Sequence, residues 1–195
     1  MRYFISLHSE NNTIMKRLAF IIPFAAILMV VACKEDKKTI EPEVVTVETT
    51  KKNEVYTSAK GDAAFKDAEL AKVFEMYIAL KTAFVNTNPK IAAGAAKRMA
   101  VALEGVEVDN KLTEAVAGIF ATQDVETQRT LFVEITAAME ATLEGALESG
   151  TIYKQFCPMA FGNTGAYWLS NSKDIYNPYF GDKMLKCGRI ASEIK

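Results

Sequence analysis

Histidine is almost missing from this sequence, since His8 is the single one among 195 residues. His8 lies in an N-terminal segment that we expect to be removed, which leaves a working chain without imidazole. Such a chain cannot carry Ser-His-Asp or Cys-His catalysis, nor a metal site with a histidine ligand. An excess of one sign of charge is missing as well, because the formal net charge is −1. A chain so balanced lacks the basic surface that nucleic-acid binding requires.

Cysteine is also scarce, and the three that occur, Cys33, Cys157 and Cys187, form no Cys-x-x-Cys redox pair. No nucleophile has a histidine beside it, and no Gly-rich phosphate-binding loop follows a predicted strand. We therefore expect no catalytic residues and interpret the protein as a non-enzyme.

The N-terminus has the pattern of an export signal. A short positive region, Met15–Arg17, precedes fourteen apolar residues at positions 18–31. That run is shorter than the roughly 20 residues of a membrane span but has the length of a secretory signal. The sequence therefore predicts a signal peptide over residues 1–32, with Met15 as the true start.

The signal ends in Val30-Val31-Ala32-Cys33, which resembles a bacterial lipobox. The resemblance implies cleavage before Cys33 and acylation of its sulfur, so that lipid holds the protein at a membrane. Residues 33–61 lack helical periodicity and are rich in Thr, Glu, Val and Lys, which indicates a flexible tether. We expect a cell-envelope protein anchored to the outer membrane, on a face that the sequence leaves undecided.

Residues 62–150 carry helical periodicity in an alanine-rich background. Apolar positions recur at three- and four-residue steps over residues 62–86, and again in three later segments that continue to Gly150. Pro89 fits the first turn of the second helix, and Asp124 is a candidate N-cap of the fourth. Because short connections favour antiparallel neighbours, we predict a mainly α fold built on an up-down four-helix bundle.

The composition changes at Thr151. Residues 151–195 hold the single tryptophan, four of the seven tyrosines and two of the three cysteines. Residues 151–157 alternate like a strand, and residues 166–169 and 188–194 are candidates for two more. We expect a small, loop-rich β or mixed C-terminal subdomain after the bundle.

Two segments of this subdomain pair a cysteine with a methionine in mirrored order: Cys157-x-Met159 and Met184-x-x-Cys187. Thiolate and thioether sulfurs select Cu(I) over Zn²⁺, Mg²⁺ or Ca²⁺. Two cysteines without histidine fall short of an ordinary zinc site. If the two segments face each other, their four sulfur atoms form a soft-metal site.

Aromatic side chains accompany both segments: Phe156, Trp168, Tyr179 and Phe180. We expect them to form a shell that excludes water from the sulfur atoms and shields the lower oxidation state of copper.

A disulfide between Cys157 and Cys187 is the alternative. Two cysteines in a loop-rich exported segment commonly pair in an oxidising compartment. Closing a loop of this size stabilises a small subdomain by on the order of 3–4 kcal/mol in the chain-entropy model. Met159 and Met184 are then packing residues. The two states are compatible in time, because a reduced pair can bind metal and an oxidised pair can lock the fold.

The motifs CPMAF, GAYWLS, NPYFGDKM and LKCG resemble a family of uncharacterised bacterial envelope domains. Such domains occur alone on lipoproteins or at the C-terminus of periplasmic adaptor subunits of heavy-metal efflux systems. Tyr77, Gln128, Arg129 and Phe132 in the helical region fit the family's pattern. The resemblance implies handling of copper, silver or similar ions and an association with efflux components.

These patterns lead to one leading hypothesis and one alternative. The leading hypothesis is a lipid-anchored envelope accessory protein that binds Cu(I) or Ag(I) in metal homeostasis or efflux. The alternative is a non-catalytic interaction or structural lipoprotein braced by a Cys157–Cys187 disulfide.

Overall fold

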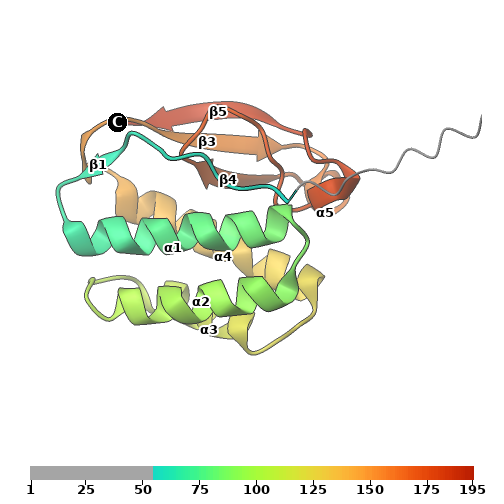
Figure 1. Ribbon diagram of the computed structural model, residues 1–195, viewed down its shortest axis with the longest axis horizontal. Coiled ribbons are helices and arrows are strands. Elements are labelled where there is room, and N and C mark those ends of the chain that lie inside the picture. Colours follow the sequence, from blue (N-terminus) through green and yellow to red (C-terminus); the bar gives the residue numbers. More distant parts are fainter. Residues whose placement is uncertain (1–54) are drawn as a thin grey trace, which may run out of the picture. The chain divides into compact units, whose positions relative to one another are not determined.

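A computed structural model describes residues 55–195 of the chain (Figure 1). The predicted signal peptide, the lipidated Cys33 and most of the predicted tether lie outside the described residues. Over residues 55–195, every helix is too short or too polar to cross a membrane.

Four long helices fill the first two thirds of this region: α1 (Ala68–Val85), α2 (Pro89–Leu103), α3 (Asn110–Phe120) and α4 (Val125–Leu143). Each begins after an Asp or Asn whose side-chain oxygen accepts a hydrogen bond from a backbone N–H of the first turn. These caps satisfy donors that a helix start leaves unpaired. The expected positions of Pro89 in the first turn of α2 and of Asp124 as the cap of α4 are confirmed.

The remaining elements are short strands and turns. Strands β1 (Ala64–Phe65) and β2 (Leu147–Ser149) pair antiparallel. A second antiparallel sheet has the order β4-β3-β5. Its members and the two short helices nearby are β3 (Ile152–Cys157), α5 (Ala160–Asn163), β4 (Ala166–Ser170), η1 (Gly181–Lys183) and β5 (Arg189–Ile194).

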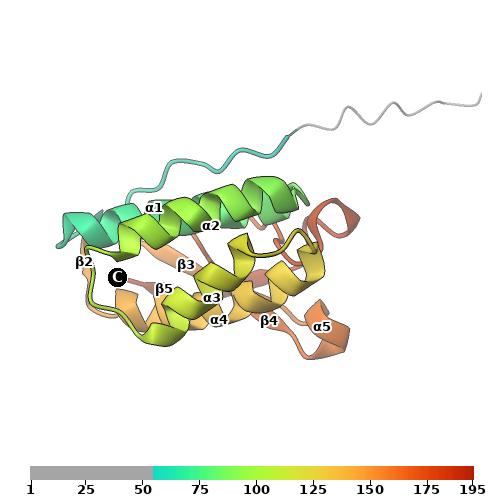
Figure 2. The same ribbon diagram turned by 90° about the horizontal axis from the view of Figure 1, so that it is seen from below.

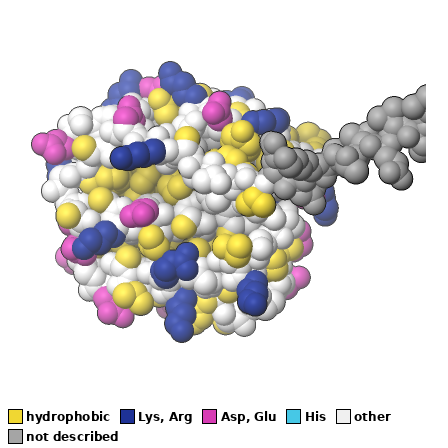
Figure 3. All heavy atoms as spheres, in the orientation of Figure 1, with side chains coloured by type: hydrophobic (Ala, Val, Ile, Leu, Met, Phe, Trp, Pro, Cys, Tyr) yellow, Lys and Arg dark blue, Asp and Glu magenta, His cyan; other side chains and the backbone are white. Residues whose placement is uncertain are grey.

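The described residues stack in layers. Figures 1 and 2 show α1 and α4 between the three-stranded sheet on one side and α2 and α3 on the other. Tyr77 of α1 joins the layers, because its hydroxyl oxygen lies 2.9 Å from Thr136 Oγ1 of α4 and accepts a hydrogen bond of 2.9 Å from Leu169 N of β4. On the face seen in Figure 3, basic and acidic side chains are scattered among apolar ones.

The mainly helical class with small antiparallel sheets towards the C-terminus is confirmed, and the three expected C-terminal strands are β3, β4 and β5. The four-helix bundle is not confirmed, because α1 and α4 each turn one side to the sheet (Figure 1). The expectation that the fourth helix continues to Gly150 is wrong. It ends at Leu143, Gly145 follows in a left-handed conformation, and Leu147 begins β2.

The first described residues form an arm along α1 that belongs to the predicted tether. Tyr56 N donates to Asn86 Oδ1, and Asn86 Nδ2 donates back to Tyr56 O, both at 2.8 Å. Asn171 Nδ2, just after β4, donates to Ala59 O. The arm therefore has side-chain hydrogen bonds both to the end of α1 and to the end of β4.

Candidate functional site

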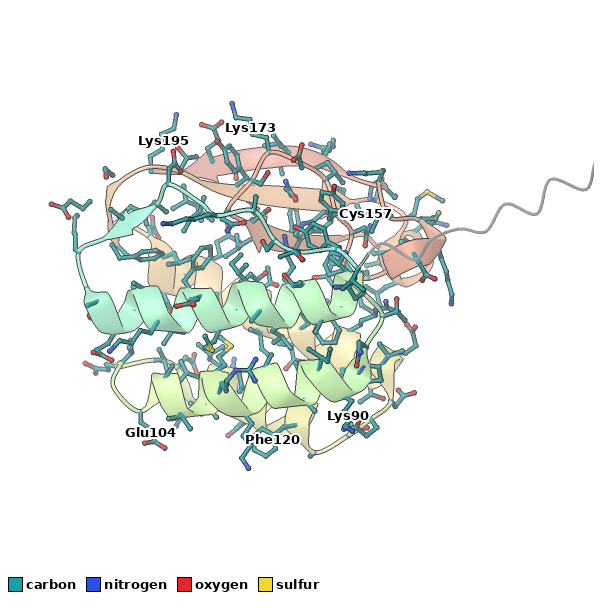
Figure 4. All side chains as sticks on the ribbon, in the orientation of Figure 1. Lys90, Glu104, Phe120, Cys157, Lys173 and Lys195 are labelled. Carbon is teal, nitrogen blue, oxygen red and sulfur yellow. The ribbon has the colours of Figure 1, made fainter. Side chains whose placement is uncertain are left out.

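The two C-terminal cysteines meet at one end of the three-stranded sheet. Cys157 is the last residue of β3, and Cys187 comes two residues before β5, the antiparallel neighbour of β3. Their Sγ atoms are 2.7 Å apart. Cys157 is fully buried and Cys187 is half-buried, so the pair is reached from the Cys187 side. Figure 4 shows Cys157 at the end of the sheet near α5.

The sulfur pair lies between two chemical states. A disulfide bond measures about 2.05 Å, whereas two thiolates on one tetrahedral metal ion are about 3.8 Å apart for metal–sulfur bonds near 2.3 Å. The observed 2.7 Å lies between these two values. The hydrogen bond with Cys157, together with burial, raises the pKa of the Cys187 thiol to about 11, so Cys187 carries its proton at neutral pH.

The two methionines flank the cysteines along the chain. Met159 precedes α5 and is 48% exposed. Met184 follows η1, is half-buried, and its carbonyl oxygen accepts a hydrogen bond of 3.0 Å from Cys187 N. The structure therefore brings the two thiols together, whereas the nearness of each methionine to a cysteine is a matter of sequence spacing. Within residues 55–195 there is no cluster of three or more His, Cys, Asp or Glu residues that could hold a metal ion.

The four predicted shell aromatics do not share one side of the sheet. Trp168 is fully buried and lies on the same face as Cys157, because it pairs with Gln155 of β3. A Cβ atom at Gly188, next to Cys187, would lie 2.7 Å from the Trp168 ring, so this indole reaches the thiol segment. Tyr179 packs edge-on against Trp168, with ring centroids 6.1 Å apart.

Phe156 points to the opposite face, because successive strand residues alternate. Its ring lies 4.5 Å from that of Tyr167, measured between centroids. Phe180 is half-buried and lines a small cavity with Tyr179 and Phe161. The buried aromatic surround of the thiol segment is therefore carried by Trp168 and Tyr179.

Asn177 fixes the loop that carries Cys187. This side chain is fully buried, and its Nδ2 donates a hydrogen bond of 2.7 Å to Cys187 O. Its Oδ1 accepts hydrogen bonds from Tyr179 N at 2.8 Å and Phe180 N at 3.1 Å. Asn177 N donates to Leu185 O, so one residue closes the loop from both ends.

Arg129 of α4 holds the same loop against the helices. It is 2% exposed, and its Nε donates to Pro178 O at 2.9 Å while its Nη2 donates to Phe84 O at 3.2 Å. Its Nη1 pairs with Glu126 Oε1 at 2.9 Å. Gly181 is required where the loop passes: its φ is +57°, and a Cβ there would lie 2.1 Å from Thr87 Oγ1.

Lys81 is a buried cation that the sequence analysis missed. It lies on α1, is fully buried, and makes two long hydrogen bonds, to Tyr56 Oη at 3.3 Å and Ser170 Oγ at 3.4 Å. Within the described chain no carboxylate lies within 4 Å of its Nζ. Burial lowers the pKa of Lys81 to about 8. Its spacing from Tyr77 and Ile78 places it on the apolar stripe, which was the available signal.

Comparison with known proteins gives one finding. A family model described as "Protein of unknown function (DUF3347)" matches residues 73–150, from α1 to the residue after β2. No curated protein and no solved structure matches the chain. The helical region, less than half of the chain, is therefore similar to a family whose function is unknown.

Proposed function

We propose that the protein is a lipid-anchored envelope accessory protein that binds Cu(I) or Ag(I) at the Cys157–Cys187 pair. The observation that carries the proposal is the meeting of two sulfur atoms from chain positions 30 residues apart, at a separation of 2.7 Å. Met159 and Met184 add thioethers on the two segments that hold the thiols. Soft sulfur donors of this kind suit monovalent coinage metals better than hard divalent ions.

The surroundings support this chemistry. Buried Trp168 and Tyr179 keep water from the inner side of the pair, and a dry site favours the lower oxidation state. Asn177 and Arg129 fix the backbone of the loop before any ion arrives, so little ordering remains to oppose binding. In this proposal lipid on Cys33 holds the chain at the outer membrane, the helices form a bundle-like support, and heavy-metal efflux components are the partners.

A disulfide-braced interaction or structural lipoprotein is the second candidate. The same short sulfur separation and the burial of Cys157 favour it, because little movement is needed to form the bond. In that state Met159 and Met184 only pack. The two candidates require different redox states of the cysteine pair. Metal binding requires the reduced thiols, because a disulfide offers no thiolate to a metal ion.

The test is anaerobic Cu(I) competition between the reduced full chain and a chromophoric chelator. We expect Cys157→Ser and Cys187→Ser each to weaken binding by more than about 100-fold, beyond the usual effect of losing a supporting contact. Met159→Leu and Met184→Leu keep the side-chain volume and remove only the thioether, so each should weaken binding several-fold. Met76→Leu on α1 is the matched control and should change nothing.

Unchanged affinity in both cysteine variants would remove the metal site. If the isolated chain also resists alkylation of Cys157 and Cys187 until it is reduced, the disulfide-braced candidate takes its place.

A further inference from the structure

The segment that carries Cys187 is positively charged. Residues 177–190 contain three cations, Lys183, Lys186 and Arg189, and a single carboxylate, Asp182. All three cations are exposed, and none has an acidic partner within 4 Å in the described part of the chain. Asp182 accepts a hydrogen bond of 3.3 Å from Thr87 Oγ1, on the side of the helices. The net charge of this segment is therefore +2.

Aromatic rings hold two of these cations in place, and Arg189 lies with its partner Phe156 on the face of the sheet opposite Cys157. Lys186 Nζ lies 3.4 Å from the centroid of the Tyr176 ring, and Lys186 directly precedes Cys187. The Arg189 guanidinium lies 5.4 Å from the centroid of Phe156, the residue before Cys157. Such cation–π contacts restrict where a long side chain can place its charge.

The third cation faces the neighbouring cavity. Lys183 lines a hollow of about 320 Å³ with Phe161, Tyr179 and Glu126. The carboxylate of Glu126 is already paired with Arg129, at 2.9 Å. The positive charge of Lys183 therefore has no paired carboxylate among the residues that line this cavity.

The charge of the rest of the chain has the opposite sign. Residues 62–150 hold eight basic and fourteen acidic side chains, whereas residues 151–195 hold six basic and three acidic ones. A bare metal cation is attracted to the helical region and repelled at the thiol end, while an anion experiences the reverse. The positive charge at the thiol end therefore disfavours the approach of a free metal cation.

We infer that the site takes its metal ion from an anionic bis-thiolate complex, [M(SR)₂]⁻, and not as a free cation. The inference rests on the proposed function and names the substrate of that site. In the exchange, two bonds form between the ion and the protein sulfurs. The two bonds between the ion and the external sulfurs break. The protons of Cys157 and Cys187 pass to the two departing thiolates, giving two RSH and a protein-bound ion with two thiolates. The charge is −1 on both sides, and nothing is oxidised or reduced.

The exposure of the sulfur atoms gives an order to the exchange. Cys187 is half-buried whereas Cys157 is fully buried, so Cys187 displaces the first external thiolate. Met159, 48% exposed, offers a neutral thioether at the surface. The three cations of residues 177–190 attract the anionic complex towards this segment.

The test measures loading rates by stopped-flow fluorescence on the reduced full chain. Trp168 is the single tryptophan and reaches the thiol segment, so its emission reports the arrival of the ion. The probes are the anionic glutathione complex of Cu(I) and the cationic acetonitrile complex of Cu(I). The variant Lys183→Gln/Lys186→Gln/Arg189→Gln is compared with Lys90→Gln/Lys97→Gln/Lys111→Gln, which removes three exposed charges from α2 and α3.

We expect the site variant to load roughly tenfold more slowly from the anionic complex, as loss of electrostatic steering predicts. Its loading from the cationic complex should be unchanged or faster. The helix variant should lose no rate with the anionic complex, and added salt should slow the wild type more than the site variant.

Equal rates in the wild type and the site variant, or the same loss with both complexes, would overturn the inference and leave metal binding intact. Absence of saturable binding with either complex would instead overturn the proposed function, and the inference with it. The two failures are therefore distinguishable.

Discussion

At the scale of single residues, burial of the Lys81 ammonium group lowers the stability of the folded protein. Its ammonium group is buried between α1, the arm and β4. Among residues 55–195 no carboxylate pairs with it, and the oxygens of Tyr56 and Ser170 are its hydrogen-bond partners. Burial lowers its pKa from 10.5 to about 8. The protonated form is therefore less favourable in the folded protein than in the unfolded chain.

This shift predicts how stability depends on pH. The free-energy cost of burying the charged Lys81 is present in full below about pH 8 and disappears as the pH rises to about 10.5. The free energy of unfolding of the wild type should therefore increase with pH between these two values. A shift of this size corresponds to about 3 kcal/mol. Lys81→Met removes the charge and also loses two long hydrogen bonds.

We expect Lys81→Met to be about 2 kcal/mol more stable than the wild type at pH 7, because the removed cost exceeds the lost hydrogen bonds. Urea unfolding at pH 7, 9 and 10.5 measures this difference, which should vanish or change sign by pH 10.5. Lys72→Met, an exposed change on the same helix, is the control and should show no such trend. A difference that stays constant with pH contradicts the assignment.

At the scale of elements, the loop between β4 and β5 depends on α4. Arg129 connects α4 to Pro178 in this loop and to Phe84 at the end of α1, so three segments share one guanidinium. A lysine has the same charge but cannot present donors in a planar fork. The position of the loop that carries Cys187 therefore depends on Arg129, a helix residue much earlier in the chain.

Arg129→Lys should destabilise the fold by about 2 kcal/mol, because it removes the guanidinium donor from the buried carbonyl oxygen of Pro178 and one of the donors to Phe84 O, which Thr87 N still contacts. Alkylation of reduced Cys187 should become faster, since the loop is held less firmly. Denaturant unfolding and timed alkylation measure the two effects. Arg98→Lys, on the exposed side of α2, should change neither, and a stability loss without faster alkylation would show that Arg129 does not hold the loop.

Local signals explain why the helices and the C-terminal strands were predictable. The Asn88-Pro89 start and the Asp124 cap act within one turn, so they are readable from neighbouring residues. The sequence alone could not predict that Cys157 and Cys187 meet, because their meeting depends on which strands pair. Strand alternation could have placed Phe156 on the face opposite Cys157.

Other features depend on distant contacts. The burial of Lys81 and Arg129 requires the sheet and its loop to close over α1 and α4. Apart from Glu126, the hydrogen-bond partners of these two side chains are distant in the sequence. The same holds for β1, whose two residues pair with β2 more than 80 positions later. The bundle prediction assumed that helices cover only helices, whereas here a sheet covers part of α1 and α4 (Figure 1).

At the scale of the whole molecule, the proposed function belongs to one end of a layered structure. The helices give an acidic body with a buried core, and the thiol pair lies at one end of the sheet, on a segment of positive charge. In the proposed function, the helices support the sheet, and the thiol pair at the end of the sheet exchanges the metal ion. The surroundings of a bound ion are therefore the quantity on which the account depends.

X-ray absorption spectroscopy of the reduced full chain, loaded with one Cu(I), measures those surroundings most directly. The account predicts a shell of sulfur neighbours alone, with one neighbour lost in each of Met159→Leu and Met184→Leu and unchanged spectra in Met76→Leu. A shell of nitrogen or oxygen neighbours, or a spectrum that Cys157→Ser leaves unchanged, contradicts the claim that the two thiols hold the metal.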